Sequence, residues 1–216
     1  VWLHAAPMFH IADGLAVFGV TMVTGVHIFI PAFTPVDSLE AIQERKISHG
    51  LFVPTMMNAL VNHPDIEKYD LSSLESVAYG ASPMPEAVIR RAMEVIPNCG
   101  FTHAYGQTEC APLSTHCGPE YHVFEGPNAG RYKSAGRAAL GVEIMICDDD
   151  GNEVPRGVVG EVCVRGPNIM LGYWNRPDLT AEAIRDGWMR SGDAAYMDED
   201  GFIYIVDRMK DMIISG

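Results

Sequence analysis

Residues 76–109, SVAYGASPMPEAVIRRAMEVIPNCGFTHAYGQTE, carry the clearest alternation of apolar runs and helical spacing in the chain. In their central part, PEAVIRRAMEVI, apolar residues recur at helical spacing, with Pro85 suited to the first turn and Pro97 limiting the end. Short apolar runs that reach a glycine, at Gly80 and Gly106, flank this helix. A strand, a helix and a second strand in this order predict a parallel sheet with helices packed on its faces.

The pattern of the sequence changes near residue 115. Upstream, segments such as ISHGLFVP and TMMNALVNH continue the alternation of apolar runs and amphipathic stretches. Downstream, residues 142–166 and 194–207 each hold two apolar strands around an Asp-Gly turn. We therefore predict an α/β fold with two lobes. An alternating α/β lobe with a mainly parallel sheet spans residues 1–115, and a smaller β-barrel-like lobe spans residues 116–206.

The composition indicates a globular protein, since 48% of the residues are hydrophobic. A formal net charge of −13 argues against a broad nucleic-acid surface, which needs clustered Lys and Arg, but leaves room for one small anion. Glycine and polar residues interrupt the apolar run from Leu15 to Ile30, so we predict no membrane helix. The chain starts without methionine or a signal peptide, and we expect it to be part of a longer protein.

The cysteines and acidic turns do not suggest a metal centre. Five cysteines, an odd number without a CxxC pair, favour a reduced, cytoplasmic chain. The spacing of Cys110, His116, Cys117 and His122 fits no zinc knuckle. The acidic runs at residues 148–150 and 198–200 lack calcium-loop spacing and are expected to be solvated turns.

Two glycine-containing bends, YGASP (79–83) and HAYGQTE (103–109), follow predicted strands. Ligands of open α/β sheets bind at the carboxyl ends of strands, so both bends are candidates for one crevice. In the second bend, Tyr105 is suited to stack on a base, Thr108 to contact a phosphate oxygen and Glu109 to bind Mg²⁺. Taken alone, this bend is equally explained by packing and turn chemistry.

Seven motifs occur in an order that resembles the adenylate-forming superfamily, which includes acyl- and aryl-CoA ligases, firefly luciferase and peptide-synthetase adenylation domains. The motifs are PMFH (7–10), FVPT (52–55), YGASPMP (79–85), YGQTE (105–109), GEVCVRGPNIMLGYW (160–174), WMRSGDAAYMDEDGF (188–202) and DRMKDMIISG (207–216). YGASPMP and SGDAAYMDEDGF look most like fatty-acyl-CoA ligases.

The resemblance implies a site for ATP or AMP and its Mg²⁺. Tyr105 would lie against adenine, Thr108 would touch the α-phosphate and Glu109 would coordinate Mg²⁺. Asp193 would accept hydrogen bonds from both ribose hydroxyls, and Arg208 would reach the ribose or phosphate. Thr108, Glu109 and Arg208 are the implied catalytic residues. The implied nucleotide-binding residues are Gly80, Ala81, Ser82, Tyr105, Gly106, Gln107, Thr108, Asp193 and Arg208. We expect the bends at residues 80, 106 and 193 to converge on one adenosine.

Simpler structural roles remain open for several of these residues. Gly80 would also suit a plain turn, Asp193 would also cap the turn after Gly192, and Arg208 would also form a surface ion pair. Lys210, in the predicted hinge 207–216, matches the pivot of a further C-terminal domain.

The acid pocket is the least defined part of the implied site. The resemblance places its walls at His10, Val53, Thr55, Ala81 and Ala104. Small residues at 81 and 104 mildly favour an aliphatic acid, whereas His10 is equally explained as a core residue. We expect the aromatic residues Tyr173, Trp174 and Trp188 to belong to the barrel core.

The implied reaction is that of an acid–thiol ligase. A carboxylate attacks the α-phosphate of MgATP to give an acyl-adenylate and pyrophosphate, and the thiol of coenzyme A then displaces AMP. A GxSxG nucleophile motif is absent, as expected for this chemistry. The family's phosphate loop and C-terminal lysine have no counterpart in the chain, so we expect it to be inactive alone. An aryl-CoA ligase, a peptide-synthetase adenylation domain and a non-catalytic nucleotide-binding module are the alternatives.

Overall fold

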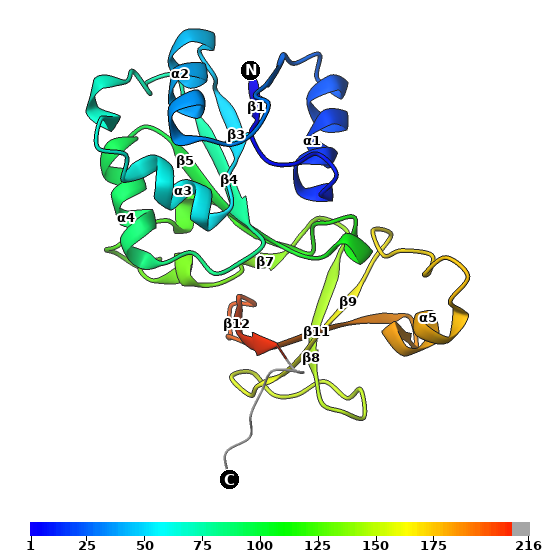
Figure 1. Cartoon of the computed structure of the whole chain (residues 1–216). Coiled ribbons are helices and arrows are strands. Elements are labelled where there is room, and N and C mark those ends of the chain that lie inside the picture. The colour runs from blue at the N-terminus through cyan, green and yellow to red at the C-terminus, as the bar shows by residue number, and fades with distance from the viewer. Residues whose placement is uncertain (209–216) are drawn as a thin grey trace. The chain divides into compact units, whose positions relative to one another are not determined.

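The computed structural model describes residues 1–208, and the chain divides between residues 103 and 104 into two units (Figure 1). The first unit contains a parallel sheet with the strand order β2 (His27–Phe29), β1 (Trp2–His4), β3 (His49–Leu51) and β4 (Ser76–Gly80). Strand β5 (Gly100–Tyr105) begins beside β4, where the Gly100 N–H donates to the carbonyl of Glu75 at 2.8 Å. The predicted parallel sheet is therefore confirmed.

Four α-helices cover this sheet: α1 (Ile11–Met22), α2 (Pro35–Arg45), α3 (Pro54–Val61) and α4 (Glu86–Val95). Figure 1 shows α2, α3 and α4 side by side on one face and α1 on the other. Helix α4 confirms the helix expected from the apolar spacing, because Val88, Ile89 and Ala92 are its buried residues and Pro85 is its N-cap. A 3₁₀ turn (Ile66–Lys68) follows α3.

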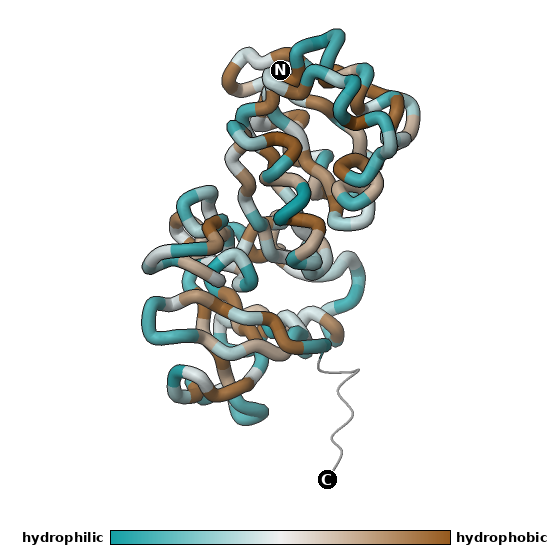
Figure 2. The backbone as a smooth tube through the Cα atoms, turned by 90° about the vertical axis from the view of Figure 1, so that its left-hand side faces the viewer, coloured by the Kyte–Doolittle hydropathy of each residue, from teal (hydrophilic) through white to brown (hydrophobic). Residues whose placement is uncertain are grey.

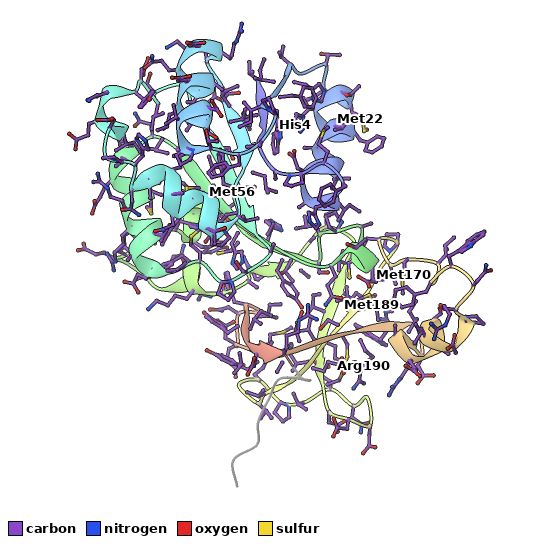
Figure 3. The ribbon with its side chains drawn as sticks, in the orientation of Figure 1. His4, Met22, Met56, Met170, Met189 and Arg190 are labelled. Atoms are coloured by element: carbon purple, nitrogen blue, oxygen red, sulfur yellow. A yellow bond between two sulfur atoms is a disulfide. The ribbon has the colours of Figure 1, made fainter. Side chains whose placement is uncertain are left out.

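A buried polar cluster joins α1 to the strands. Asp13, in the first turn of α1, is 0% exposed and accepts hydrogen bonds from the Trp2 indole at 3.2 Å and from His4 Nδ1 at 3.0 Å. The other His4 nitrogen lies 2.9 Å from His27 Nδ1 on β2, and the His27 ring lies 3.0 Å from the Thr21 hydroxyl. His4 lies on the strand that faces α1 in Figure 3. Because a buried carboxylate needs donors, this cluster fixes the helix to two strands.

The second unit is antiparallel. Its main sheet has the strand order β10 (Ile184–Arg185), β11 (Trp188–Met197), β9 (Gly160–Arg165) and β8 (Glu143–Cys147), and β12 (Ile203–Arg208) pairs with β11. A short pair, β6 (Thr115–Cys117) with β7 (Arg137–Ala138), precedes this sheet, and α5 (Pro177–Ala183) precedes β10. Three short 3₁₀ turns also belong to this unit: Thr108–Cys110, Pro119–Tyr121 and Arg131–Lys133. The predicted barrel-like β structure is confirmed.

The two Asp-Gly turns form as expected. Gly151 and Gly201 adopt left-handed φ angles of 89° and 82°, which glycine tolerates best. Backbone N–H groups of the turns donate to the carboxylates of Asp148 and Asp198. Figure 2 shows hydrophobic stretches along the strands of this unit and hydrophilic stretches at its turns.

The expectation of a fully reduced chain is wrong for one pair of cysteines, because Cys147 and Cys163 form a disulfide. Cys147 lies opposite Glu161 in the β8–β9 register, and Cys163 is two residues further along β9. Strand pairing therefore brings together two thiols that are 16 residues apart in sequence, which the absence of a CxxC motif does not exclude. Cys99, Cys110 and Cys117 are free thiols. Within residues 1–208, every helix is too short or too polar to cross a membrane.

Replacing Asp13 with alanine is expected to lower the free energy of unfolding of the first unit by about 2–4 kcal/mol, since Trp2 Nε1 and His4 Nδ1 lose a buried acceptor. Urea unfolding followed by tryptophan fluorescence measures this change, because Trp2 touches the cluster. Glu40→Ala, an exposed carboxylate on α2, is the control and should leave the transition unchanged. Equal stability of the two variants would contradict the proposed importance of the cluster.

Candidate functional site

The carboxylate of Asp193, on β11, is the centre of a hydrogen-bond network in the second unit and is only 7% exposed. Its Oδ2 accepts from the Tyr105 hydroxyl at 2.7 Å and from Gln107 Nε2 at 3.2 Å. Its Oδ1 forms an ion pair with Arg208 Nε at 3.1 Å, and Arg208 lies opposite Asp193 in the β11–β12 register. Burial and the charge of Asp193 raise the pKa of Tyr105, so its hydroxyl stays a neutral donor.

An irregularity in β11 turns Asp193 towards these donors. The register between β11 and β9 shifts between Arg190 and Ala194, and Gly192 has a φ of 75°, as in a β-bulge. The Glu161 carboxylate holds the irregular segment, because it accepts from the Gly192 N–H at 2.8 Å and from Arg190 Nε at 2.6 Å. Arg190 also donates to the carbonyl of Asp148 at 3.0 Å. Figure 3 labels Arg190 beside Met189 on the same strand.

The YGQTE bend needs a glycine because its backbone at residue 106 lies very close to Pro112. Gly106 has a φ of 159°, and a Cβ there would meet the carbonyl oxygen of Pro112 at 1.8 Å. The Ser114 N–H donates to the carbonyl of Tyr105 at 2.8 Å, which closes the bend. Glycine at position 106 is therefore required by this close approach within the loop.

Glu109, in the 3₁₀ turn Thr108–Cys110, is held by the segment 168–173. The Tyr173 hydroxyl donates to Glu109 Oε1 at 2.8 Å, and the Met170 N–H donates to the Glu109 carbonyl at 2.8 Å. Asn168 Nδ2 donates to the carbonyls of Cys110 and Leu113 at 2.9 and 3.1 Å. The hydrogen bond to Glu109 and burial raise the pKa of Tyr173, which keeps this hydroxyl a donor.

The expectation that three aromatic residues form barrel core is wrong for two of them. Tyr173 is 38% exposed and Trp174 is 90% exposed, because both lie on the segment between β9 and α5 rather than on a strand. Trp188 lies on β11 and is half-buried, with the Arg165 guanidinium 4.4 Å from its ring centroid. The role of Tyr173 was missed because its partner lies 64 residues away, although the GYW motif did mark the segment.

The remaining predicted residues of the first unit follow neighbouring parallel strands. His10 follows β1, Val53 and Thr55 follow β3, and Gly80 ends β4, so all of them lie at the same edge of the sheet. Ala81 adopts a left-handed φ of 68°, an unusual conformation for a residue with a Cβ. Ser82 next to it is exposed. His10 is also exposed in this structure.

The predicted residues thus form two groups, one in each unit. Ala104, Tyr105, Gln107, Glu109, Asp193 and Arg208 belong to the second unit, whose hydrogen bonds bring Tyr105, Gln107, Asp193 and Arg208 together. Thr108 is exposed in the same bend. Lys210 lies outside the described residues.

A cavity of about 460 Å³ in the first unit lies away from these residues. Ile66, Tyr69, Leu74 and residues of the segment 91–98 are among its lining residues. The cavity is therefore close to the amino ends of β4 and β5, whereas Gly80 is at the carboxyl end of β4. None of the predicted site residues lines it.

Glu109 fits the role of a single carboxylate ligand for Mg²⁺. One of its oxygens accepts from Tyr173, and within residues 1–208 no hydrogen bond or ion pair engages the other. The described residues contain no group of three or more His, Cys, Asp or Glu side chains that would hold a metal by themselves. Nucleotide-bound Mg²⁺ is commonly held by one or two carboxylates together with phosphates and water, and one carboxylate meets this need.

Comparisons with known proteins agree with the fold. The family model described as AMP-binding enzyme matches residues 1–174. The chain is 40% identical, over its full length, to the medium/long-chain fatty-acid–CoA ligase FadD8 of Mycobacterium tuberculosis, of which it covers 36%. It is 39% identical, over 99% of its length, to the feruloyl-CoA synthase of an Amycolatopsis species, of which it covers 42%.

Among solved structures, the O-succinylbenzoate coenzyme A synthetase MenE of Bacillus subtilis, in complex with ATP and a magnesium ion, is similar with a TM-score of 0.87. It is 29% identical, and the match covers 100% of this chain and 43% of that one. An α/β unit and an antiparallel unit are thus the fold of the adenylate-forming superfamily. The chain belongs to the family of AMP-binding enzymes, and it spans about two fifths of the length of these relatives.

Glu161 and Arg190 support Asp193 and were not expected from the sequence. Replacing Glu161 with glutamine is expected to lower the free energy of unfolding of the second unit by about 3 kcal/mol, because Arg190 keeps a buried, unpaired charge. Urea unfolding monitored at Trp188 measures this loss. Glu143→Gln is the matched control, since it also breaks a cross-strand pair with arginine, but an exposed one, and should have no measurable effect. Similar losses in both variants would contradict the role given to Glu161.

Proposed function

We propose that the complete protein containing this chain is an ATP-dependent acyl-CoA ligase. The observation that carries the proposal is the network in which Tyr105 and Gln107, from the YGQTE bend, donate to Asp193 on β11. Two motifs that are 88 residues apart in sequence therefore meet at one buried carboxylate. Two relatives are named as a medium/long-chain fatty-acid–CoA ligase and a feruloyl-CoA synthase, which supports the proposed reaction type.

In the proposed reaction, the carboxylate oxygen of the acid attacks the α-phosphorus of ATP and pyrophosphate leaves with the electron pair of the broken P–O bond. The sulfur of coenzyme A then attacks the acyl carbon and releases AMP, and the thiol proton passes to solvent. Asp193 orients the nucleotide through the ribose hydroxyls, while Tyr105 packs against adenine and Thr108 contacts the α-phosphate. Arg208 contributes a positive charge at the ribose or phosphate.

Mg²⁺ bound at Glu109 would neutralise phosphate charge during the attack. The Tyr173 hydroxyl leaves one carboxylate oxygen of Glu109 available, because it engages only Oε1. This arrangement supports the assignment of Glu109 as the metal ligand, with Tyr173 holding the carboxylate in place.

The acid is proposed to be a fatty acid. Ala81 and Ala104, two of the residues proposed to line its pocket, have small side chains that leave room for an alkyl chain. A feruloyl-CoA synthase is among the relatives, so an aromatic acid is the second candidate. His10, Val53 and Thr55 follow strands at the same edge of the sheet as Ala81, which supports a shared pocket wall.

The complete protein should release AMP only when ATP, coenzyme A and an acid are all present. A panel of fatty acids from C6 to C18, with ferulate and benzoate, is expected to give the highest kcat/KM with a fatty acid. AMP release can be followed by a coupled assay, and the thioester by mass spectrometry. A higher kcat/KM with ferulate or benzoate would identify an aryl-CoA ligase instead. AMP release that does not depend on the acid would contradict ligase function and favour a nucleotide-binding module.

Residues 1–216 alone are expected to form no acyl-adenylate at a measurable rate. The chain has an excess of negative charge, and the family's phosphate loop and C-terminal lysine are not among its residues. ATP–pyrophosphate exchange with radiolabelled pyrophosphate and a fatty acid measures adenylate formation directly, and the complete protein is the positive control. Exchange above background by the chain alone would refute this expectation.

A further inference from the structure

We infer that Gln107 is a positioning residue, whose side-chain amide holds Asp193 in the orientation that ribose binding requires. This inference rests on the proposed function, because Asp193 is the proposed ribose acceptor. It differs from a direct contact between Gln107 and the nucleotide, which membership of the YGQTE motif would suggest. In this assignment, Gln107 affects the nucleotide only through Asp193.

The amide of Gln107 bridges two acceptors on β11. Its Nε2 donates to the carbonyl oxygen of Ser191 at 2.7 Å and to Asp193 Oδ2 at 3.2 Å. Both partners are pure acceptors, so only the NH₂ end of the amide can face them, and the two N–H bonds are used. The chemistry of the partners therefore determines which way the amide points.

With this bridge in place, the two oxygens of Asp193 have different partners. Oδ2 accepts from Gln107 and from the Tyr105 hydroxyl, so two protein donors occupy it. Oδ1 pairs with Arg208, whose side chain is 65% exposed and free to adjust when a ligand binds. Because only the exposed Arg208 side chain engages it within residues 1–208, Oδ1 is the oxygen proposed to accept from the ribose hydroxyls, and Gln107 keeps the carboxylate turned in this way.

Two replacements of similar size distinguish the effect of the hydrogen bonds from the effect of side-chain shape. In Gln107→Glu, a carboxylate would face the Ser191 carbonyl and Asp193 Oδ2, so two attractions become repulsions. In Gln107→Met, the side chain keeps a similar length but donates no hydrogen bond. We expect the methionine variant to lose ribose recognition and the glutamate variant to lose more.

The chain offers a matched control because Gln43 is its other glutamine. The Oε1 of Gln43 accepts from the Asp70 N–H at 2.8 Å, a task that a glutamate oxygen can also perform. Gln43→Glu therefore makes the same chemical change at a position where an acceptor is needed, and it should leave all kinetic constants unchanged.

The experiment compares ATP with 2′-deoxy-ATP and 3′-deoxy-ATP in the complete protein and its Gln107→Met, Gln107→Glu, Asp193→Asn and Gln43→Glu variants. The measured quantity is the ratio of kcat/KM for ATP to that for each deoxy analogue. The wild-type protein should prefer ATP, and Gln107→Met should reduce this preference about tenfold, mainly through the KM for ATP. A purely structural role would lower kcat/KM for ATP and its analogues alike and leave the ratio unchanged.

The outcomes separate the inference from the proposed function. If Asp193→Asn abolishes the preference for ATP but Gln107→Met retains it in full, the role of Gln107 is overturned while the ribose role of Asp193 stands. If the wild-type protein itself does not distinguish ATP from either analogue, the ribose assignment fails and the inference fails with it. Thermal melting of each variant identifies loss of folding, and if Gln107→Glu does not fold, Gln107→Met decides the question.

Discussion

A carboxylate that is almost completely buried must find hydrogen-bond donors, and Asp193 finds them in two different parts of the second unit. Tyr105 and Gln107 approach from the YGQTE bend, and Arg208 approaches from β12. The irregular stretch of β11 presents this carboxylate, and Glu161 on the neighbouring strand β9 stabilises the stretch by accepting from Arg190 and from the Gly192 N–H. The burial of one charge thus connects the bend, the sheet and the end of the described chain.

Much of the fold could be predicted from local sequence signals. The periodicity of residues 85–96 predicted helix α4 almost to its ends, and the Asp-Gly pairs marked both hairpin turns, because each signal depends on neighbours in sequence. The disulfide between Cys147 and Cys163 was not predictable in this way. It depends on the register of β8 and β9, which places two residues that are 16 positions apart next to each other.

The same holds for the site, where the sequence identified candidate residues but not the side chains that surround them. The motifs identified Gln107, Glu109 and Asp193, but they did not reveal which side chains hold them. Tyr173 was expected to be core because aromatic residues usually pack inside, yet its segment lies outside the strands and its hydroxyl reaches Glu109. Contacts between residues 64 to 88 positions apart arise from the tertiary fold, and one sequence without coordinates does not contain them.

The electrostatics of the second unit explain why nucleotide chemistry would need further groups. Tyr105 and Tyr173 have raised pKa values, so both carboxylates of the site are approached by neutral donors that leave their negative charge in place. Two nearby guanidinium groups are already engaged, that of Arg190 by Glu161 and that of Arg208 by Asp193. A triphosphate brought to this site, in a chain with a net charge of −13, would meet repulsion unless a metal ion and additional cations accompanied it. In the proposed function, the unit therefore orients the nucleoside, and the neutralisation of its phosphates requires charges from elsewhere.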